Sequence, residues 1–141
     1  MEKCTIGIVL NITMDRVILI FKDHPDWQKG KYNFPGGHYE DGETAEACIS
    51  REFNEETDIL IPESNWMHVG KIKDRRNSFI VDILVAYKSD SFMPIATTSE
   101  PPSWQWINDL PLDIIPNVEW LIAFAKDATH DGPHFATFEY N

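Results

Sequence analysis

The sequence predicts an α+β domain in which helices cover both faces of a mixed β-sheet. Runs rich in β-branched and aromatic residues, typical of strands, occur at residues 5–12, 17–21, 66–73, 79–87, 104–107 and 135–140. Two segments have helical character, residues 43–61, which lack Pro and Gly, and a second segment that starts near residue 117. This order of elements is typical of an α/β/α sandwich. With 141 residues and 43% hydrophobic content, the chain can bury one core, so we expect a single domain over residues 1–141.

The first two predicted strands lead into a glycine-rich turn. Residues 5–12 and 17–21 flank a polar turn around Asp15, which indicates a strand pair. After a polar loop, Pro35, Gly36 and Gly37 mark a further turn immediately before the first helical segment. We therefore expect the chain to run from a strand pair through a loop into a helix.

The first helix has a recognisable start. Thr44 can act as its N-cap, because the threonine hydroxyl can accept a hydrogen bond from an unpaired backbone N–H. Glu46 lies in the first turn, where the helix dipole favours a negative charge. These two residues predict that the helix begins near residue 45.

The helix carries an acidic stripe in its second half. Glu52, Glu55 and Glu56 fall on one face, because residues three and four positions apart are neighbours on a helix. Their like charges repel, so a bound cation is expected, and ligands that are all oxygen favour Mg²⁺ or Mn²⁺ over zinc. A solvated acidic face, with Arg51 paired to Glu55, is the alternative that the stripe alone leaves open.

The spacing upstream of this stripe decides between the two interpretations. Residues 36–59 resemble the Nudix box, which consists of Gly, five residues, Glu, seven residues, Arg-Glu, an apolar residue, one residue, Glu-Glu, one residue, Gly and an apolar residue. The matching positions in this chain are Gly37, Glu43, Arg51, Glu52, Phe53, Glu55, Glu56 and Ile59. So many fixed positions make the match specific.

The resemblance implies the Nudix fold and the chemistry of Nudix hydrolases, which cut a phosphoanhydride of a nucleoside diphosphate linked to another group. It implies that Glu52, Glu55 and Glu56 bind Mg²⁺, or Mn²⁺ in its place, and that Gly37 also lies at the metal. Glu100, in a Glu-Pro pair like that of small family members, would add a carboxylate from a loop unless it is a plain surface residue. Which carboxylate acts as general base varies within the family, and the candidates are Glu52, Glu55 and Glu100.

Other box residues would support the carboxylates. The resemblance implies that Arg51 orients them through salt bridges and that Glu43 ties the loop to the helix. Gly36 and Gly37 would let the backbone approach the phosphates. Asp58 departs from the pattern, because the family has a glycine there to end the helix in a left-handed conformation. Asp can adopt that conformation at a cost on the order of 1 kcal/mol, so the departure concerns the helix end and leaves the carboxylates unaffected.

Several residues outside the box are candidates for substrate contact. Trp27 and Tyr32, in the loop before the glycine-rich turn, could stack on a nucleobase or merely cover the core. Arg75 and Arg76 lie in a charged turn and could bind phosphate, although the tip of a solvated hairpin is the ordinary alternative.

The second helix is expected to cover one face of the sheet. Asn117 follows Pro116 and is a suitable N-cap, and apolar residues then recur at helical spacing. Trp120 on this helix could lie at the edge of a pocket or in the core.

The features of the chain look most like those of small MutT-type nucleoside triphosphate diphosphatases. Such an enzyme would convert an NTP or dNTP, oxidised or not, to the monophosphate and pyrophosphate. One alternative is a Nudix hydrolase of dinucleoside polyphosphates, ADP-ribose or nucleotide sugars. A second alternative is a catalytically silent nucleotide-binding module, which the complete set of box carboxylates disfavours.

Composition limits the partners. A formal net charge of −11 argues against binding of a nucleic-acid polymer or an anionic membrane, since both need a basic surface. Cys4 and Cys48 are expected to be small buried thiols in a reducing compartment rather than a disulfide. No apolar run approaches the length of a membrane span. We expect a cytoplasmic protein that acts on a small nucleotide and, by analogy with family members of this size, possible homodimers.

Overall fold

A computed structural model describes residues 1–130 and 134–141 of the chain. Along the sequence its elements are β1 (Glu2–Leu10), β2 (Arg16–Phe21), β3 (Tyr32–Asn33), β4 (Gly36–His38), α1 (Ala45–Thr57), η1 (Glu63–Asn65), β5 (Met67–Asp74), β6 (Phe79–Tyr87), β7 (Pro102–Trp106), η2 (Ile107–Asp109), α2 (Val118–Ala128) and β8 (Ala136–Tyr140), where η marks a short 3₁₀ helix.

The strands form one mixed sheet in the order β3-β2-β1-β6-β5-β8, with β4 paired to β1 and β7 paired to β2. The central strands β1 and β6 are parallel, whereas β1 and β2 are antiparallel. Along one edge of β1, Leu10 pairs with Val17 of β2, while Ile6 pairs with Gly36 of β4. Two strands thus share this edge, and the glycine-rich β4 lies directly beside the centre of the sheet.

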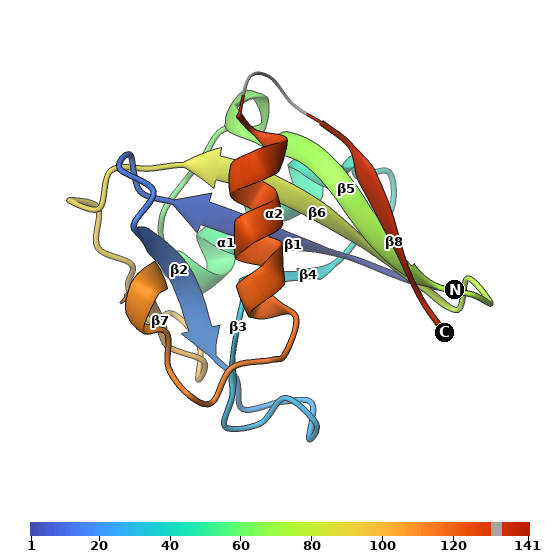
Figure 1. Cartoon of the computed structure of the whole chain (residues 1–141), viewed down its shortest axis with the longest axis horizontal. Helices are drawn as coiled ribbons and strands as arrows, with labels where there is room; N and C mark the ends of the chain where they lie inside the picture. Colours follow the sequence, from blue (N-terminus) through green and yellow to red (C-terminus); the bar gives the residue numbers. More distant parts are fainter. Residues whose placement is uncertain (131–133) are drawn as a thin grey trace.

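The two α-helices cover opposite faces of the sheet. Successive residues of a strand point to opposite faces, so Ile8 of β1 packs in the cluster that contains Leu121 of α2. Its neighbour Val9 packs in the cluster that contains Phe53 of α1. Figure 1 shows α2 in front of the sheet and α1 behind it. The predicted α+β sandwich with a mixed sheet between helices is confirmed.

Helix α1 has the predicted caps. The hydroxyl of Thr44 accepts a hydrogen bond from the Ala47 N–H at 3.1 Å, and Glu46 lies in the first turn. At the other end Asp58 adopts the left-handed conformation, with φ 60° and ψ 20°, and its N–H donates to the Asn54 carbonyl at 2.9 Å. Asp58 therefore performs the helix-ending role that the Nudix pattern gives to glycine.

Other sequence expectations need correction. The first strand runs over Glu2–Leu10, earlier than expected, and Ile12 is exposed beyond its end. Strands β3 and β4 were not expected, because each is too short to show an alternating pattern. Asn117 precedes α2 but makes no side-chain capping bond, and its Nδ2 instead donates to the Tyr140 hydroxyl at 3.2 Å. Cys4 is partly buried, Cys48 is fully buried, and both are free thiols.

The last strand, β8, extends the sheet beside β5 in a parallel orientation. Phe138 of β8 packs edge-on against Trp120 and Phe124 of α2, with ring centroids 4.9 and 5.0 Å away. Trp120 is thus a partly exposed edge of the aromatic layer under α2, with 38% of its surface accessible. Neither α-helix in the described part of the chain has the length and apolar character needed to cross a membrane.

Candidate active site

The site forms where β4 meets the second half of α1. Three consecutive pairs with β1 fix β4, from Cys4 opposite His38 to Ile6 opposite Gly36. Just upstream, the Pro35 carbonyl accepts a hydrogen bond from the Gly7 N–H at 2.8 Å. The backbone of Gly36 and Gly37 is therefore held by the central strand of the sheet.

Both glycines lie too close to their neighbours to carry a side chain. A Cβ on Gly36 would lie 2.0 Å from the Thr5 carbonyl oxygen. A Cβ on Gly37 would lie 2.4 Å from the carboxyl carbon of Glu52. The absence of side chains thus brings the backbone of β4 against a carboxylate of α1.

Glu56 is the most deeply buried of the box carboxylates, with 8% of its surface accessible. Its Oε1 accepts a hydrogen bond from the Gly36 N–H at 3.0 Å. Burial raises the pKa of Glu56 to about 8, and the negative charges of Glu52 and Glu100 add to this, whereas the Gly36 N–H and the positive charge of Lys22 oppose it. A buried carboxylate with this environment favours either a proton or a bound cation.

Glu52 and Glu55 lie beside Glu56 and share one cationic partner. Nη1 of Arg51 donates to Glu52 at 2.9 Å and to Glu55 at 3.4 Å. Burial raises the pKa of Glu52 although Arg51 opposes the shift. Glu55 is the exposed member of the set, with 56% of its side chain accessible.

The guanidinium of Arg51 is fully engaged. Its five N–H donors meet both carboxylate oxygens of Glu43 at 2.8 and 2.9 Å, the His38 carbonyl at 3.0 Å, Glu52 and Glu55. Arg51 and the Glu40 N–H, which also donates to Glu43, hold the pKa of Glu43 at about 2. Arg51 thus orients the carboxylates and ties the loop to the helix.

Glu100 is buried next to a second cation, Lys22. Its Oε1 accepts a hydrogen bond from Lys22 Nζ at 2.9 Å, and its Oε2 accepts from the backbone N–H groups of Asp23 and His24 at 2.9 and 3.3 Å. Its negative charge contributes to the raised pKa of Glu56. Glu100 is therefore not a plain surface residue, and protein donors occupy both of its oxygens.

Glu100 also belongs to a small group of potential metal ligands. Ligand atoms of Asp23, His24 and Glu100 all lie within 4.8 Å of one another. Nδ1 of His24 already contacts Asp23 at 2.5 Å, so hydrogen bonding within the protein accounts for the proximity of these groups.

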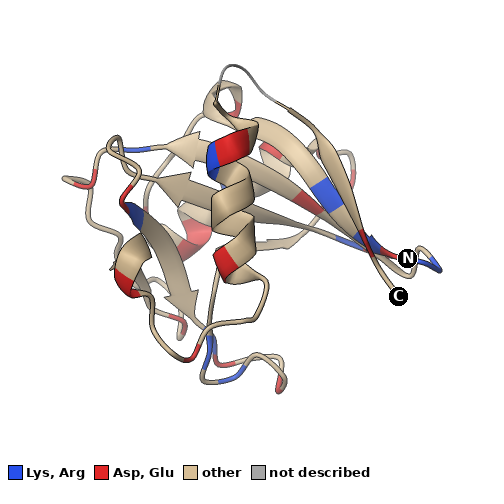
Figure 2. Ribbon diagram, in the orientation of Figure 1, with Lys and Arg blue, Asp and Glu red and all other residues tan. Residues whose placement is uncertain are grey.

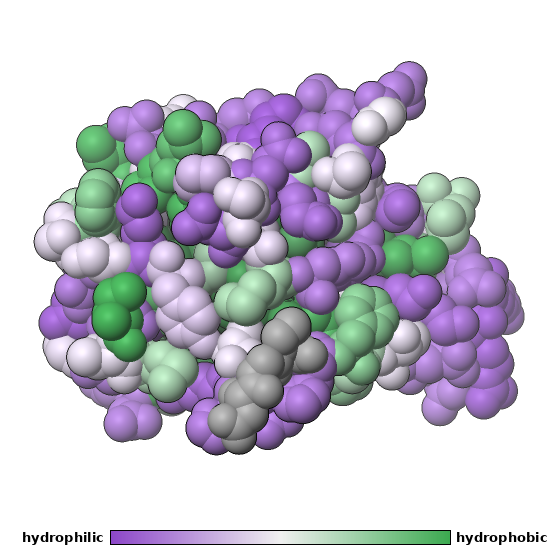
Figure 3. All heavy atoms as spheres, turned by 90° about the horizontal axis from the view of Figure 1, so that it is seen from above, coloured by the Kyte–Doolittle hydropathy of each residue, from purple (hydrophilic) through white to green (hydrophobic). Residues whose placement is uncertain are grey.

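The remaining candidate residues lie in two different places. Tyr32 is half-buried against Phe21, with ring centroids 5.0 Å apart, and Trp27 is exposed in the same loop. Arg75 lies at the β5–β6 turn with its Nε 3.9 Å from Glu139, and Arg76 is exposed beside it. That turn forms one end of the long axis, next to both termini (Figure 1), where Figure 2 shows several basic residues and Figure 3 a hydrophilic surface. Tyr32 is therefore close to β4 in the sequence. The turn that carries Arg75 lies apart from the box carboxylates, at the end of the molecule.

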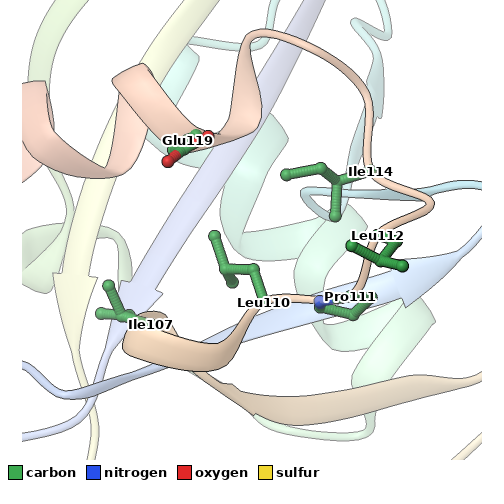
Figure 4. Close-up of a pocket in the computed structure, with 6 residues that line it drawn as sticks. All are labelled: Ile107, Leu110, Pro111, Leu112, Ile114 and Glu119. Carbon is green, nitrogen blue, oxygen red and sulfur yellow. The ribbon is translucent and has the colours of Figure 1, made fainter.

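A shallow hollow of about 310 Å³ lies between the segment after β7 and the start of α2. Figure 4 shows Leu110 and Ile114 facing this space, with Glu119 of α2 on its far side. Ile114 forms a parallel bridge with Tyr32. Ile114, in the wall of the hollow, is thus paired with β3, the strand that leads into Gly36 and Gly37.

Comparison with known proteins agrees with this geometry. The model of the NUDIX domain matches residues 2–125, which is most of the chain. The chain belongs to the Nudix family. This match confirms the resemblance inferred from the box and supports the assignment of the chain as a Nudix hydrolase.

Three relatives of this Nudix chain illustrate the range of the family. The NAD-capped RNA hydrolase NudC of Vibrio parahaemolyticus is 29% identical over 105 residues, which are 74% of this chain and 39% of NudC. This chain thus spans about two fifths of the length of that relative. The MutT protein of Bacillus halodurans has 22% identity and a TM-score of 0.70, covering 100% of this chain and 91% of that one. The NUDIX domain of Shewanella oneidensis NrtR, solved with ADP-ribose, has 18% identity and a TM-score of 0.69, covering 89% and 86%.

The donor chemistry of the Nudix site fits a hard divalent cation. Glu52, Glu55 and Glu56 offer carboxylate oxygens, and the Gly37 backbone lies against Glu52. All of these donors are oxygen atoms, the ligands that Mg²⁺ and Mn²⁺ prefer. Partly buried Glu52 and buried Glu56 have raised pKa values, and the main cause in both is that burial removes water from the carboxylate.

Sequence reasoning missed Lys22 as a member of the site. A single lysine after a strand resembles any surface lysine, and its partner Glu100 lies 78 positions away in the chain. The sequence offered one indirect sign, since an apolar strand, 17–21, ends directly before it.

Proposed function

We propose that this Nudix chain hydrolyses a phosphoanhydride of an NTP or dNTP, oxidised or not, and releases the monophosphate and pyrophosphate. The observation that carries the proposal is the arrangement of Glu52 and Glu56, two carboxylates with raised pKa values held against the backbone of β4. Such a site favours a divalent cation and the phosphates that the cation would bind.

Glu52, Glu55 and Glu56 would bind Mg²⁺, or Mn²⁺ in its place, and the backbone of Gly37 would lie at the same metal ion. When bound, the cation would neutralise phosphate charge and provide an acidic water molecule. Arg51 holds Glu52 and Glu55 in place through two bonds of its guanidinium. Exposed Glu55 is a suitable proton acceptor for an attacking water, with Glu52 as the other candidate, because general-base catalysis needs a reachable carboxylate.

The nucleoside would lie near Tyr32. Its ring is partly exposed, and its bridge to Ile114 joins it to the hollow beside α2. A concave site of this size suits a small ligand such as a nucleoside better than a polymer. The net charge of −11 supports the same choice, since a long polyanion needs a basic surface. A cytoplasmic location, where nucleotides are abundant, belongs to the same proposal.

A second candidate function is hydrolysis of a dinucleotide such as NAD or of ADP-ribose. It is favoured by the 29% identity to the NAD-capped RNA hydrolase NudC and by the fold shared with the ADP-ribose complex of NrtR. Both substrates contain the same diphosphate unit, so the carboxylates and glycines would act in the same way. The two candidates differ in the leaving group.

The test is turnover of a panel of NTPs, dNTPs, 8-oxo-dGTP, diadenosine polyphosphates, NAD, ADP-ribose and nucleotide sugars, with Mg²⁺ and with EDTA. Pyrophosphate, phosphate and the monophosphate products are measured separately, because cleavage of NAD or ADP-ribose at the diphosphate yields two monophosphates and releases neither pyrophosphate nor phosphate. Metal-dependent release of pyrophosphate from a triphosphate would support the first candidate. Turnover restricted to NAD or ADP-ribose would support the second, and Mg²⁺ binding without turnover of any substrate would favour a silent binding module.

A further inference from the structure

We propose that a buried hydrogen bond between Tyr39 and Asp82 positions Arg51, and through Arg51 the carboxylates of Glu52 and Glu55. Tyr39 and Asp82 are positioning residues in this proposal, because they act through another residue. The inference rests on the proposed function and deepens it by naming what holds the loop between β4 and α1, residues 39–44, in place.

This loop is tied to the helix by Arg51. Nη2 of Arg51 donates to the His38 carbonyl at 3.0 Å, and Nε and Nη2 meet the two carboxylate oxygens of Glu43 at 2.8 and 2.9 Å. The same guanidinium donates to Glu52 and Glu55 through Nη1. The orientation of Arg51 towards the box carboxylates therefore depends on where the loop lies.

Charge alone does not keep the loop beside the helix. Arg51 pairs with four carboxylates, those of Glu40 and Glu43 in the loop and of Glu52 and Glu55 in α1. One positive charge among four carboxylates leaves repulsion between the loop and the helix, since like charges at close range repel. An additional anchor without a negative charge of its own is therefore suited to this loop.

Tyr39 provides this anchor to the sheet. Its hydroxyl donates to Oδ2 of Asp82 in β6, its N–H donates to the Lys3 carbonyl at 3.3 Å, and Nζ of Lys3 lies 4.6 Å from the centre of its ring. Tyr39 directly follows His38, so fixing Tyr39 also fixes the carbonyl that Arg51 contacts. The sheet thus holds the loop on one side, and Arg51 holds it on the other.

Asp82 is an unusual residue for its place in the sheet. It is the only charged residue of β6, and 5% of its surface is accessible. Its Oδ1 meets Nε2 of His68 at 2.9 Å, so both of its oxygens have protein partners. A buried charge adds little net stability, because desolvation offsets its bonds, and its best-supported role is to specify one arrangement. The arrangement that Asp82 specifies is the position of Tyr39 and of the loop.

Two variants break this hydrogen bond in different ways. Tyr39→Phe removes only the hydroxyl, and Asp82→Leu removes the acceptor. Asp82→Leu should keep or raise the melting temperature, since an apolar residue often replaces a buried charge without loss of stability. Tyr87→Phe is the matched control, because the Tyr87 hydroxyl shares a hydrogen bond with Thr129 of the α2 end, and the residue lies at the C-terminal end of the same strand.

The first readout is hydrogen exchange of the Arg51 Nε–H, measured by nuclear magnetic resonance in EDTA. This N–H donates to Glu43 at 2.8 Å, so it is protected while the loop is in place. We expect exchange at least roughly fivefold faster in both variants, the effect of one lost hydrogen bond on a local opening. The double variant, Tyr39→Phe with Asp82→Leu, should be no faster than either single variant, because both lose the same bond. The control should match the wild type.

The second readout is the affinity for Mg²⁺ alone, measured by calorimetry. Removing a group that holds a metal ligand typically lowers metal affinity about 10–100-fold. Tyr39 and Asp82 act one step further away, through Arg51, so we expect a loss of roughly three- to tenfold in both variants and none in Tyr87→Phe. A purely structural role predicts a different pattern, in which Tyr39→Phe and Tyr87→Phe behave alike and a stable Asp82→Leu binds Mg²⁺ normally.

Faster exchange at Arg51 together with weaker Mg²⁺ binding in Tyr39→Phe and Asp82→Leu, with neither change in Tyr87→Phe, would support the inference. Exchange or Mg²⁺ affinity equal to that of the wild type in folded Tyr39→Phe would overturn it and leave the proposed function standing. If one variant fails to fold, the other decides, because both lose the same bond. A wild type that binds no Mg²⁺ would count against the proposed function, and the exchange rates in EDTA would still decide whether the bond positions Arg51.

Discussion

Glu56→Gln should change the pH dependence of folding stability in the absence of metal. Burial raises the pKa of Glu56 to about 8 in the folded protein, whereas an unfolded chain has a glutamate pKa of about 4.3. The folded state therefore holds this proton more tightly. Its contribution to stability is fully present below about pH 4 and is lost as the pH rises towards 8.

The size of the effect follows from the two pKa values. Each pH unit between them corresponds to about 1.4 kcal/mol, so the wild type should lose roughly 3 kcal/mol from this group between pH 5 and pH 7. Glutamine does not titrate and can still accept the hydrogen bond of the Gly36 N–H. The unfolding free energy of Glu56→Gln minus that of the wild type should therefore rise with pH and level off above about pH 8.

Urea denaturation in EDTA at several pH values from 5 to 9, followed by tryptophan fluorescence, measures this difference. Glu63→Gln, at an exposed position in η1, is the control for losing one carboxylate. Saturating Mg²⁺ at pH 8 should raise the unfolding free energy of the wild type above that of Glu56→Gln. A ligand that binds the native state stabilises the protein that binds it, here the wild type and not the variant. A difference that stays constant with pH in EDTA would refute the assigned environment of Glu56.

Three further changes test other parts of the site. Gly37→Ala should reduce turnover at least roughly tenfold while the protein stays folded, since the new Cβ would displace the carboxylate of Glu52; steady-state kinetics beside a melting curve checks this, and normal turnover would contradict it. Asp58→Gly should be neutral or stabilising by up to about 1 kcal/mol, because glycine adopts the left-handed conformation freely; a clear fall in melting temperature would contradict this. Arg51 lowers the pKa of Glu43, so the wild type should lose unfolding free energy as the pH falls from about 4.5 towards 2. Arg51→Met should lack this pH-dependent loss. Acid denaturation curves of both proteins measure it, and parallel curves would argue against the pairing.

The sequence was most informative where structure depends on near neighbours. The N-cap of Thr44 and the shared face of Glu52 and Glu56 follow from spacings within one helix, and the left-handed Asp58 follows from the glycine that the box pattern has at this position. The box spacing then supplied the family, and with it the fold, because so many fixed positions rarely coincide. The domain match over residues 2–125 confirms that step.

Contacts between distant parts of the chain could not be predicted in this way. The partnership of Lys22 with Glu100 and the pairing of Gly36 with Ile6 depend on how β2, β4 and β7 are placed around β1. Asn117 shows the same limit. Local spacing predicted that its side chain would cap α2, but the side chain donates a hydrogen bond to Tyr140 of β8 instead. Burial is also a property of the whole fold, so the raised pKa of Glu56 has no local sequence pattern.

The most direct test of the central claim compares the wild type with Glu56→Gln in metal-dependent turnover of the best substrate from the panel. The account predicts activity with Mg²⁺, none with EDTA, and a loss of at least roughly a hundredfold in the folded variant, given the several kcal/mol that a bound metal contributes. Equal turnover by the two proteins would contradict the claim that the carboxylates of α1 and the backbone of β4 form the catalytic metal site.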